Sequence, residues 1–196
     1  MNDPVARASG LVRVEYHMFY LAEGTQDEQP PFRPENGLIF SAPERAVVLA
    51  GINSGSVHTT VEVYQNPIAR AHTEEWDEVV DHSVQAVSGR MKVASLMDAS
   101  PAWPTLTPFG PGHYRVRLHA RGRDRAYDGH LAEAEEDYLL QIWPSQPEPD
   151  GVHKQSDQAG AGFRQTALQE PLNEPAPPPV GQARSQALER LRRRHT

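Results

Sequence analysis

The chain has 196 residues, no cysteine and a formal net charge of −7. The lack of cysteine excludes a disulfide framework, a thiolate zinc site and a cysteine nucleophile, and no apolar run approaches the roughly 20 residues that a membrane helix needs. The first residues, MNDPVARASG, contain an acid and no apolar segment of the kind that a secretory signal carries. We therefore expect a cytoplasmic protein with no membrane partner.

The charge is unevenly distributed along the chain. Through Pro149 there are 12 Lys and Arg against 21 Asp and Glu, a balance of −9, and from Asp150 onward there are 7 against 5, a balance of +2. An acidic body is poorly suited to nucleic acid, because neutralised phosphates supply most non-specific affinity. It suits a basic protein partner, which it would attract over a distance, and it also serves solubility alone.

The first half of the chain reads as short strands that follow a flexible N-terminus at residues 1–10. Residues 11–21, LVRVEYHMFYL, alternate between apolar and polar positions, which predicts one strand with a period of two. The side chains expected on its inner face are those of Val12, Val14, Tyr16, Met18 and Tyr20. LIFS, at residues 38–41, predicts a short strand. AVVLAGI, at residues 46–52, predicts a strand that is covered on both faces, and VHTTVEVY, at residues 57–64, alternates again.

The second half continues the pattern. EEWDEVVDHSVQAV could open a helix, but its valines and the alternation of Val80, His82, Val84 and Ala86 favour a strand. MKVASLM predicts another short strand, and the four prolines of DASPAWPTLTPFGPG predict a long surface loop. DYLLQIWP, at residues 137–144, predicts a last strand that ends at its proline.

An arginine-rich stretch, GPGHYRVRLHARGRDR, precedes that last strand. Tyr114, Val116, Leu118 and Ala120 would form the inner face of a strand that follows a Pro-Gly turn. The alternate side chains would face solvent or the acids of another strand. Together with two aromatic residues of the proline-rich loop, which would line a pocket mouth or cover one end of the fold, they form the candidate binding surface: Arg115, Arg117, His119, Arg121, Trp103 and Phe109.

About eight short strands without a convincing long helix predict an all-β fold, an antiparallel β-sandwich spanning residues 11–144. An eight-stranded barrel is the alternative. Residues 145–182 are rich in Pro, Gly and Gln and hold few large apolar residues, so we expect them to be disordered. Residues 183–196 form a short basic C-terminus with helical spacing, which would either dock on a partner or fray in solvent.

The sequence offers no constellation that points to catalysis. No two of its 9 histidines stand two or four residues apart beside a carboxylate, the spacing that is common in metal sites, and no G-x-S-x-G elbow or phosphate-binding glycine loop is present. Paired acids such as Glu74 with Glu75 lie in expected loops, where they would be solvated. We therefore expect a protein that is not an enzyme and that needs no cofactor or metal.

The order of the segments resembles the competence nuclease-inhibitor (ComJ) family, in which a Ser/Glu-Tyr-x-x-Phe core opens the domain. The matching segments are VRVEYHMFYL, GLIFS, AVVLAGINSG, TVEVYQ, WDEVVDHSVQAVSGRMKVASLM, the Pro-Gly-x-Tyr hairpin start of GPGHYRVRLHARG, and DYLLQIWP. The resemblance covers residues 11–144 and rests on element order, spacing and aromatic placement. The C-terminal tail has no counterpart, and the arginine density departs from the family.

That resemblance implies a small all-β protein, in a family whose members include a cytoplasmic inhibitor of a DNA-entry nuclease. No residue roles transfer with it. We therefore expect a non-enzymatic protein-binding module, an inhibitor or immunity-type protein whose partner is a nuclease or another toxin. The alternatives are a regulatory β-domain that binds a small molecule or peptide, and a single-stranded nucleic-acid binder that uses the arginines and aromatic stacking.

Overall fold

The structure, a computed structural model, describes residues 3–24, 30–96, 103–130 and 133–169. Within these residues it contains strands β1 (Ala6–Glu15), β2 (Met18–Ala22), β3 (Ile39–Ala42), β4 (Arg45–Leu49), β5 (Ser54–Val63), β6 (Glu78–Ala86), β7 (Lys92–Ala94), β8 (Gly112–Arg121), β9 (Asp137–Pro144) and β10 (Gly151–Gln155), and one helix, α1 (Gln158–Gln169). The all-β class is therefore confirmed, with one short helix added.

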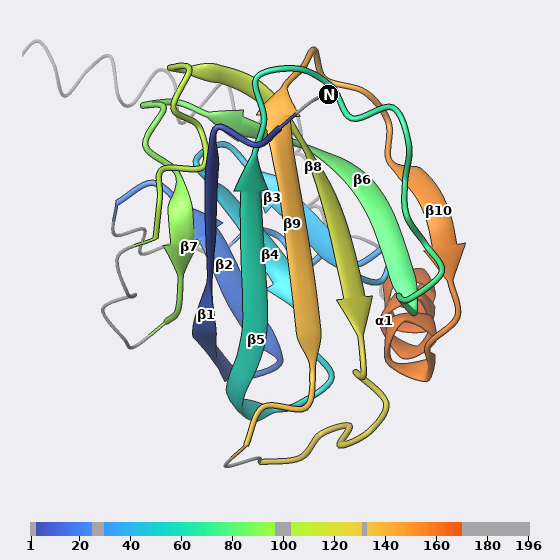
Figure 1. Cartoon of the computed structure of the whole chain (residues 1–196). Helices are drawn as coiled ribbons and strands as arrows, with labels where there is room; N and C mark the ends of the chain where they lie inside the picture. Colours follow the sequence, from blue (N-terminus) through green and yellow to red (C-terminus); the bar gives the residue numbers. More distant parts are fainter. Residues whose placement is uncertain (1–2, 25–29, 97–102, 131–132, 170–196) are drawn as a thin grey trace, which may run out of the picture.

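The strands form one curled sheet rather than two facing sheets (Figure 1). Its order is β10-β6-β8-β9-β5-β1-β2-β4-β3, and β7 pairs with β2 beside this path. The pair of β5 and β9 is parallel, and the other pairs are antiparallel. The expected sandwich is therefore wrong, whereas the expected antiparallel pairing holds for every strand pair among the described residues except β5 with β9. Period-two alternation determines which side chains face inward, but the twist and curl of the sheet decide how it closes.

The curl brings the two ends of the sheet toward each other. The backbone N–H of Glu44, in the turn between β3 and β4, donates to the carbonyl of Gln85 in β6 at 2.9 Å. The Ser41 hydroxyl of β3 lies 2.8 Å from Nε2 of His82 in β6. The result is a half-barrel with a polar seam between β3 and β6.

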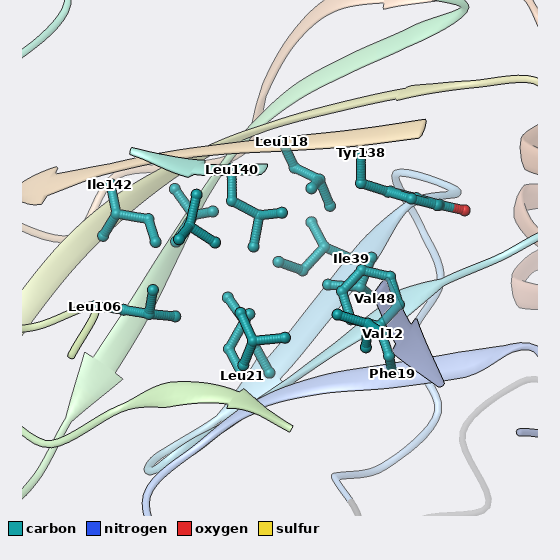
Figure 2. Close-up of a cluster of buried hydrophobic side chains, with 14 of the residues drawn as sticks. Val12, Phe19, Leu21, Ile39, Val48, Leu106, Leu118, Tyr138, Leu140 and Ile142 are labelled. Atoms are coloured by element: carbon teal, nitrogen blue, oxygen red, sulfur yellow. The ribbon is translucent and has the colours of Figure 1, made fainter. Parts of the chain in front are cut away.

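The inside of the half-barrel holds the main hydrophobic core. Figure 2 shows aliphatic and aromatic side chains from β1, β2, β3, β4, β8 and β9 pointing toward one another, together with Leu106 from the loop before β8. The inward positions expected for the last two long strands are confirmed, because Val116, Leu118, Leu140 and Ile142 are all fully buried. Burying each such side chain contributes about 1.5–3 kcal/mol.

A second apolar cluster lies on the other side of β2 and β4. It contains Tyr20, Ala22, Phe40, Val47 and Leu49, and Phe163 of α1 packs against it. All five residues of β4 are buried, which confirms the expectation that this apolar run is covered on both faces.

Residues 145–169 are ordered, so the prediction of disorder is wrong for this part of the tail. β10 pairs with β6, the buried ion pair of Arg123 with Asp157 anchors the start of α1, and Arg164 of α1 donates a hydrogen bond to the buried carboxyl group of Glu78 at 3.1 Å. Ion pairing and backbone pairing thus replace the large apolar residues that the segment lacks. Residues 170–196, which include the expected basic C-terminus, lie outside the described residues. At the other end, β1 begins at Ala6, within the expected flexible N-terminus. The part of the chain that the structure describes contains no helix that is long and apolar enough to cross a membrane.

Candidate functional site

The arginine row points away from the core, as expected, but most of it is covered. Arg115, Arg117 and His119 are 5%, 4% and 1% exposed. The groups that contact them come from the neighbouring strands β6 and β9 and from the connections β5–β6 and β9–β10. Of the two alternatives expected for this face, solvent is wrong for three of its four side chains, because strand alternation says nothing about which loops fold over a face.

Each covered side chain has a structural partner. Arg117 donates from Nε and Nη2 to the carboxylate of Asp81 at 2.7 and 2.9 Å and from Nη1 to the Ile68 carbonyl at 3.1 Å. Arg115 donates to the carbonyls of Glu148 and Pro149 at 2.9 and 2.8 Å. Arg117 thus meets an acid of a neighbouring strand, one of the two alternatives expected from the sequence.

His119 lies on the same outer face, beside the ring of Trp76, with the ring centroids 5.3 Å apart. Burial is the main cause that lowers the pKa of His119 from 6.5 to about 4. The ring is therefore buried and remains neutral near pH 7.

The two aromatic candidates lie apart from each other. Trp103 is buried in the main core and packs over Gly10 of β1, so it covers the sheet and does not line a pocket mouth. Phe109 is 44% exposed. Of the six sequence-based candidates, only Arg121 and Phe109 keep substantial exposure, and the set does not form one surface.

The turn between β1 and β2 is the unusual feature at the lower end of Figure 1. Two residues, Tyr16 and His17, connect the strands, and their φ angles are 53° and 63°. A two-residue hairpin with both φ angles positive normally uses Asn-Gly, because bulky side chains clash in this conformation. Each such residue costs on the order of 1–3 kcal/mol, which the surrounding structure must offset, and such strain concentrates at functional sites.

Contacts from the loop that follows β4 hold the turn in place. The backbone N–H of His17 donates to the Asn53 carbonyl at 3.1 Å, and the His17 carbonyl accepts from the N–H of Ala50 at 2.8 Å. The His17 ring lies with Nδ1 3.0 Å from the Gly51 carbonyl and Nε2 3.2 Å from Oδ1 of Asp128. Asp128 itself has a φ of 59°. Three non-glycine residues with positive φ therefore meet at one place.

The loop beneath the turn is fixed by a buried carboxylate. Glu136 accepts hydrogen bonds from the N–H groups of Gly51 and Ile52 at 3.1 and 2.6 Å and from the Tyr138 hydroxyl at 2.6 Å. Gly51 has no room for a Cβ, because the backbone carbonyl of Arg123 lies against it. The turn is thus supported by a rigid base.

Two tyrosine side chains project from this end of the molecule. Tyr16 is 69% exposed and Tyr127 is 54% exposed, and the Tyr127 ring centroid lies 5.7 Å from that of His17. Beside Tyr16 is a hollow of about 370 Å³, and beside Tyr127 is one of about 290 Å³. The first is lined by Arg13, Glu15, Tyr16, Asn53, Ser54, Leu96 and His130. We call Tyr16, His17, Asn53, Tyr127 and Asp128 the turn-end surface.

The connection between β8 and β9 makes this end acidic. Its exposed charged residues among those described are Asp124, Asp128, Glu133 and Glu135, against Arg125. Among the described residues, no group of three or more His, Asp or Glu side chains could hold a metal ion. Asp124 accepts from the N–H groups of Gln158 and Ala159 at the start of α1, and Asp128 contacts His17, so two of the four acids also have partners within the protein.

Sequence reasoning missed the turn-end surface because it placed Tyr16 on the inner face of one continuous strand. The run LVRVEYHMFYL contains no Gly, Pro, Asn or Asp, the residues that normally mark a turn. The only available signal was the length of the run, 11 alternating residues with aromatic residues at adjoining positions.

No family model matches the chain, and no curated protein matches it. Two solved structures are similar. One, described as "Crocagin biosynthetic gene J", is 16% identical with a TM-score of 0.48, over 72% of this chain and 98% of the other. The second, "ComJ, inhibitor of the DNA degrading activity of NucA, from Bacillus subtilis", is 12% identical with a TM-score of 0.47, over 74% and 99%. At these values, neither similarity carries an argument about function.

Proposed function

We propose that this protein is a protein-binding module of the inhibitor or immunity type, and that the turn-end surface is its binding site, which acts by binding alone and without catalysis. The observation that carries the proposal is the exposed Tyr16 on a strained, rigidly supported turn, with the exposed Tyr127 beside the same turn. Tyrosine is enriched among the residues that dominate binding energy, because it offers a large amphipathic contact and loses little conformational entropy. A pre-organised turn lowers that loss further.

The charge of this end suggests the kind of partner. Four exposed carboxylates against one arginine in the connection between β8 and β9 complement a basic surface. A nuclease that binds the phosphate backbone, or a toxin with a cationic cleft, has such a surface. We infer that the protein occludes this kind of cleft, with the tyrosines entering it and the acids at its rim.

The test is capture of the partner by the tagged protein from a lysate of its source organism, followed by an activity measurement. We expect the captured protein to degrade plasmid DNA, or to show another toxic activity, that stoichiometric addition of the purified chain suppresses. Tyr16→Ala should weaken capture and suppression by at least tenfold, and both should weaken as salt rises.

The matched control is Phe109→Ala, which removes another exposed aromatic side chain, one that precedes β8 and lies outside the turn-end surface. It should bind like the unmodified protein. If Tyr16→Ala and Phe109→Ala bind equally well, the turn-end surface is not the site. If the captured protein loses no activity when the chain is added, the inhibitor function is wrong.

A further inference from the structure

A serine, a histidine and an aspartate form a hydrogen-bonded chain at the polar seam between β3 and β6. The hydroxyl of Ser41 lies 2.8 Å from Nε2 of His82, and Nδ1 of His82 lies 2.7 Å from Oδ1 of Asp150. The three residues share no contact with the turn-end surface and play no part in the proposed function. Their atom order, hydroxyl to Nε2 and Nδ1 to carboxylate, is the arrangement in which a histidine activates a serine nucleophile.

The fold supplies each member from a different segment. Ser41 lies on the edge strand β3, opposite Ala46 of β4. His82 is on the inward face of β6, opposite Val116 of β8, and Asp150 directly precedes β10, whose Gly151 pairs with Asp81. The curl of the sheet, which local sequence does not encode, brings the three together.

Further contacts orient the aspartate. Nδ2 of Asn36 donates to Oδ2 of Asp150 at 2.5 Å, while Oδ1 of Asn36 accepts from the backbone N–H groups of Leu38 and Ile39 at 2.9 Å each. Those two bonds fix which end of the amide faces Asp150. Arg115 donates to the carbonyls of Glu148 and Pro149, the two residues before Asp150. This member of the arginine row therefore helps to position Asp150 beside His82.

The electrostatics suit the roles. Burial acts to raise the pKa of Asp150, but the hydrogen bond and charge of His82, the hydrogen bond from Asn36 and the charge of Arg115 together hold it below its usual range. Asp150 is therefore a carboxylate at neutral pH and accepts the Nδ1–H of His82. That tautomer leaves the Nε2 lone pair free to accept the proton of the Ser41 hydroxyl at 2.8 Å, and the second acceptor of this hydroxyl, the Ser83 carbonyl, is farther away at 3.3 Å.

Solvent also reaches the three side chains of this hydrogen-bonded set. The side chains of His82 and Asp150 are 15% and 33% exposed, and Ser41 is half-buried. A small electrophile can therefore approach the hydroxyl, whereas a bulky one would meet the strands on either side of the seam.

We propose that Ser41, His82 and Asp150 form a nucleophilic serine site that accepts short acyl esters. The Ser41 oxygen adds to the ester carbonyl while its proton passes to Nε2 of His82. The adduct then expels the alkoxide, which takes that proton and leaves as an alcohol, so an acyl-serine remains. Water repeats the sequence on the acyl-serine, with His82 as base and then as acid, and releases the carboxylic acid and the free serine.

The protein contains a matched control for the pair of Ser41 and His82. The hydroxyl of Ser54 lies 2.9 Å from Nδ1 of His130, a serine–histidine pair of similar length. Among the ion pairs of the described residues, none joins His130 to a carboxylate. Among the described residues, Ser54→Ala therefore removes a serine whose histidine partner forms no ion pair with a carboxylate.

The experiment exposes the full chain to a small fluorophosphonate and maps the modified residue by mass spectrometry, and it measures hydrolysis of p-nitrophenyl acetate in parallel. We expect one adduct, on Ser41, with loss of fluoride. Ser41→Ala should abolish adduct and hydrolysis, Asp150→Asn should slow both by about 10²–10⁴-fold because the histidine tautomer is no longer enforced, and Ser54→Ala should behave as the unmodified chain.

The adduct site in the unmodified protein decides the question even if a variant fails to fold. No adduct on Ser41, under conditions that label a known serine hydrolase completely, would overturn the proposal, and so would equal labelling of Ser41 and Ser54. If Ser41→Ala lowers the melting temperature and the unmodified chain shows no labelling, the three residues only tie β3 to β6.

Discussion

Arg123 and Asp157 form a buried bidentate ion pair between the connection that follows β8 and the residue just before α1. Nε and Nη2 of Arg123 donate to the two carboxylate oxygens of Asp157 at 2.6 and 2.8 Å, and the side chains are 0% and 2% exposed. Nη1 of Arg123 also donates to the Gly37 carbonyl at 3.0 Å. One side chain therefore joins the β8–β9 connection, the entry to β3 and the C-terminal helix.

Breaking this pair should destabilise the protein strongly. We expect Asp157→Asn to lower the free energy of unfolding by about 3–5 kcal/mol, because it leaves the guanidinium buried without a counter-charge. Asp137→Asn is the control, since it removes the acid of the exposed pair with Arg121 and should cost about 1 kcal/mol or less. Urea denaturation measures both, and equal costs would mean that Arg123 is reached by water.

Arg117→Ser should also destabilise the fold. It removes both hydrogen bonds to Asp81 and the contact with the Trp143 ring at 5.3 Å, so we expect a loss of about 3 kcal/mol, as for a broken buried pair. Arg13→Ser, at an exposed position of β1, should change stability by about 0.5 kcal/mol or less. Thermal and urea denaturation compare the two variants. A small loss of stability in Arg117→Ser would mean that the Arg117 side chain is exposed to solvent.

Glu78 gives the stability a specific pH dependence. Burial, followed by the charge of Asp157, raises the pKa of Glu78 from 4.5 to about 7, against the opposing charges of Arg123 and Arg164. The folded state therefore holds this proton more tightly than the unfolded state does. The resulting contribution to stability is complete below pH 4.5 and is lost as the pH rises through 7.

We expect Glu78→Gln, which cannot lose a proton, to remove this loss. Relative to the unmodified protein, the variant should gain stability steadily between pH 4.5 and pH 7.5. Urea denaturation at intervals across that range measures the difference. Parallel curves for the two proteins would show that the pKa of Glu78 is the same in the folded and unfolded states.

The ordered part of the tail should be required for stability. A chain that ends at Pro144 loses β10, α1 and the acid that pairs with Arg123, so we expect it to be unfolded or to melt at least 10 °C lower. A chain that ends at Gln169 keeps every contact described for α1 and should melt like the full protein. If the two shortened chains melt together, the tail does not contribute to the fold.

Tyr16→Asn should stabilise the protein while it weakens partner binding. Asparagine tolerates the φ of 53° at this position better than tyrosine does, so we expect a gain of about 1 kcal/mol from relieved strain. Tyr127→Asn, a change at an exposed tyrosine outside the strained turn, should bring no such gain. Thermal denaturation provides the measurement, and a loss of stability in Tyr16→Asn would mean that the tyrosine ring supports the turn by packing.

Local pattern predicted most individual elements. The alternation in DYLLQIWP predicted β9 residue for residue, from Asp137 to Pro144. The stretch that could have opened a helix, EEWDEVVDHSVQAV, contains a strand, β6, as its valines and its alternation predicted. These predictions succeeded because a strand's two faces follow directly from the covalent geometry of an extended chain.

Three features escaped because no local signal marks them. The turn at Tyr16 and His17 uses residues that avoid positive φ, so its conformation depends on the loop that holds it. Helix α1 has few large apolar residues and is held in place by contacts between side chains from distant segments, Arg123 with Asp157 and Arg164 with Glu78. The covered arginine row is buried by connections whose paths the strand pattern does not specify.

The sequence by itself determined the all-β class, most strand positions and the inward or outward direction of their side chains, because these follow from period-two alternation along the chain. Only the tertiary structure decided that the sheet curls into a half-barrel, that the tail joins it, and which residues meet at the turn-end surface and at the seam. Those outcomes depend on contacts between residues far apart in sequence, such as Ser41 with His82 and Arg123 with Asp157.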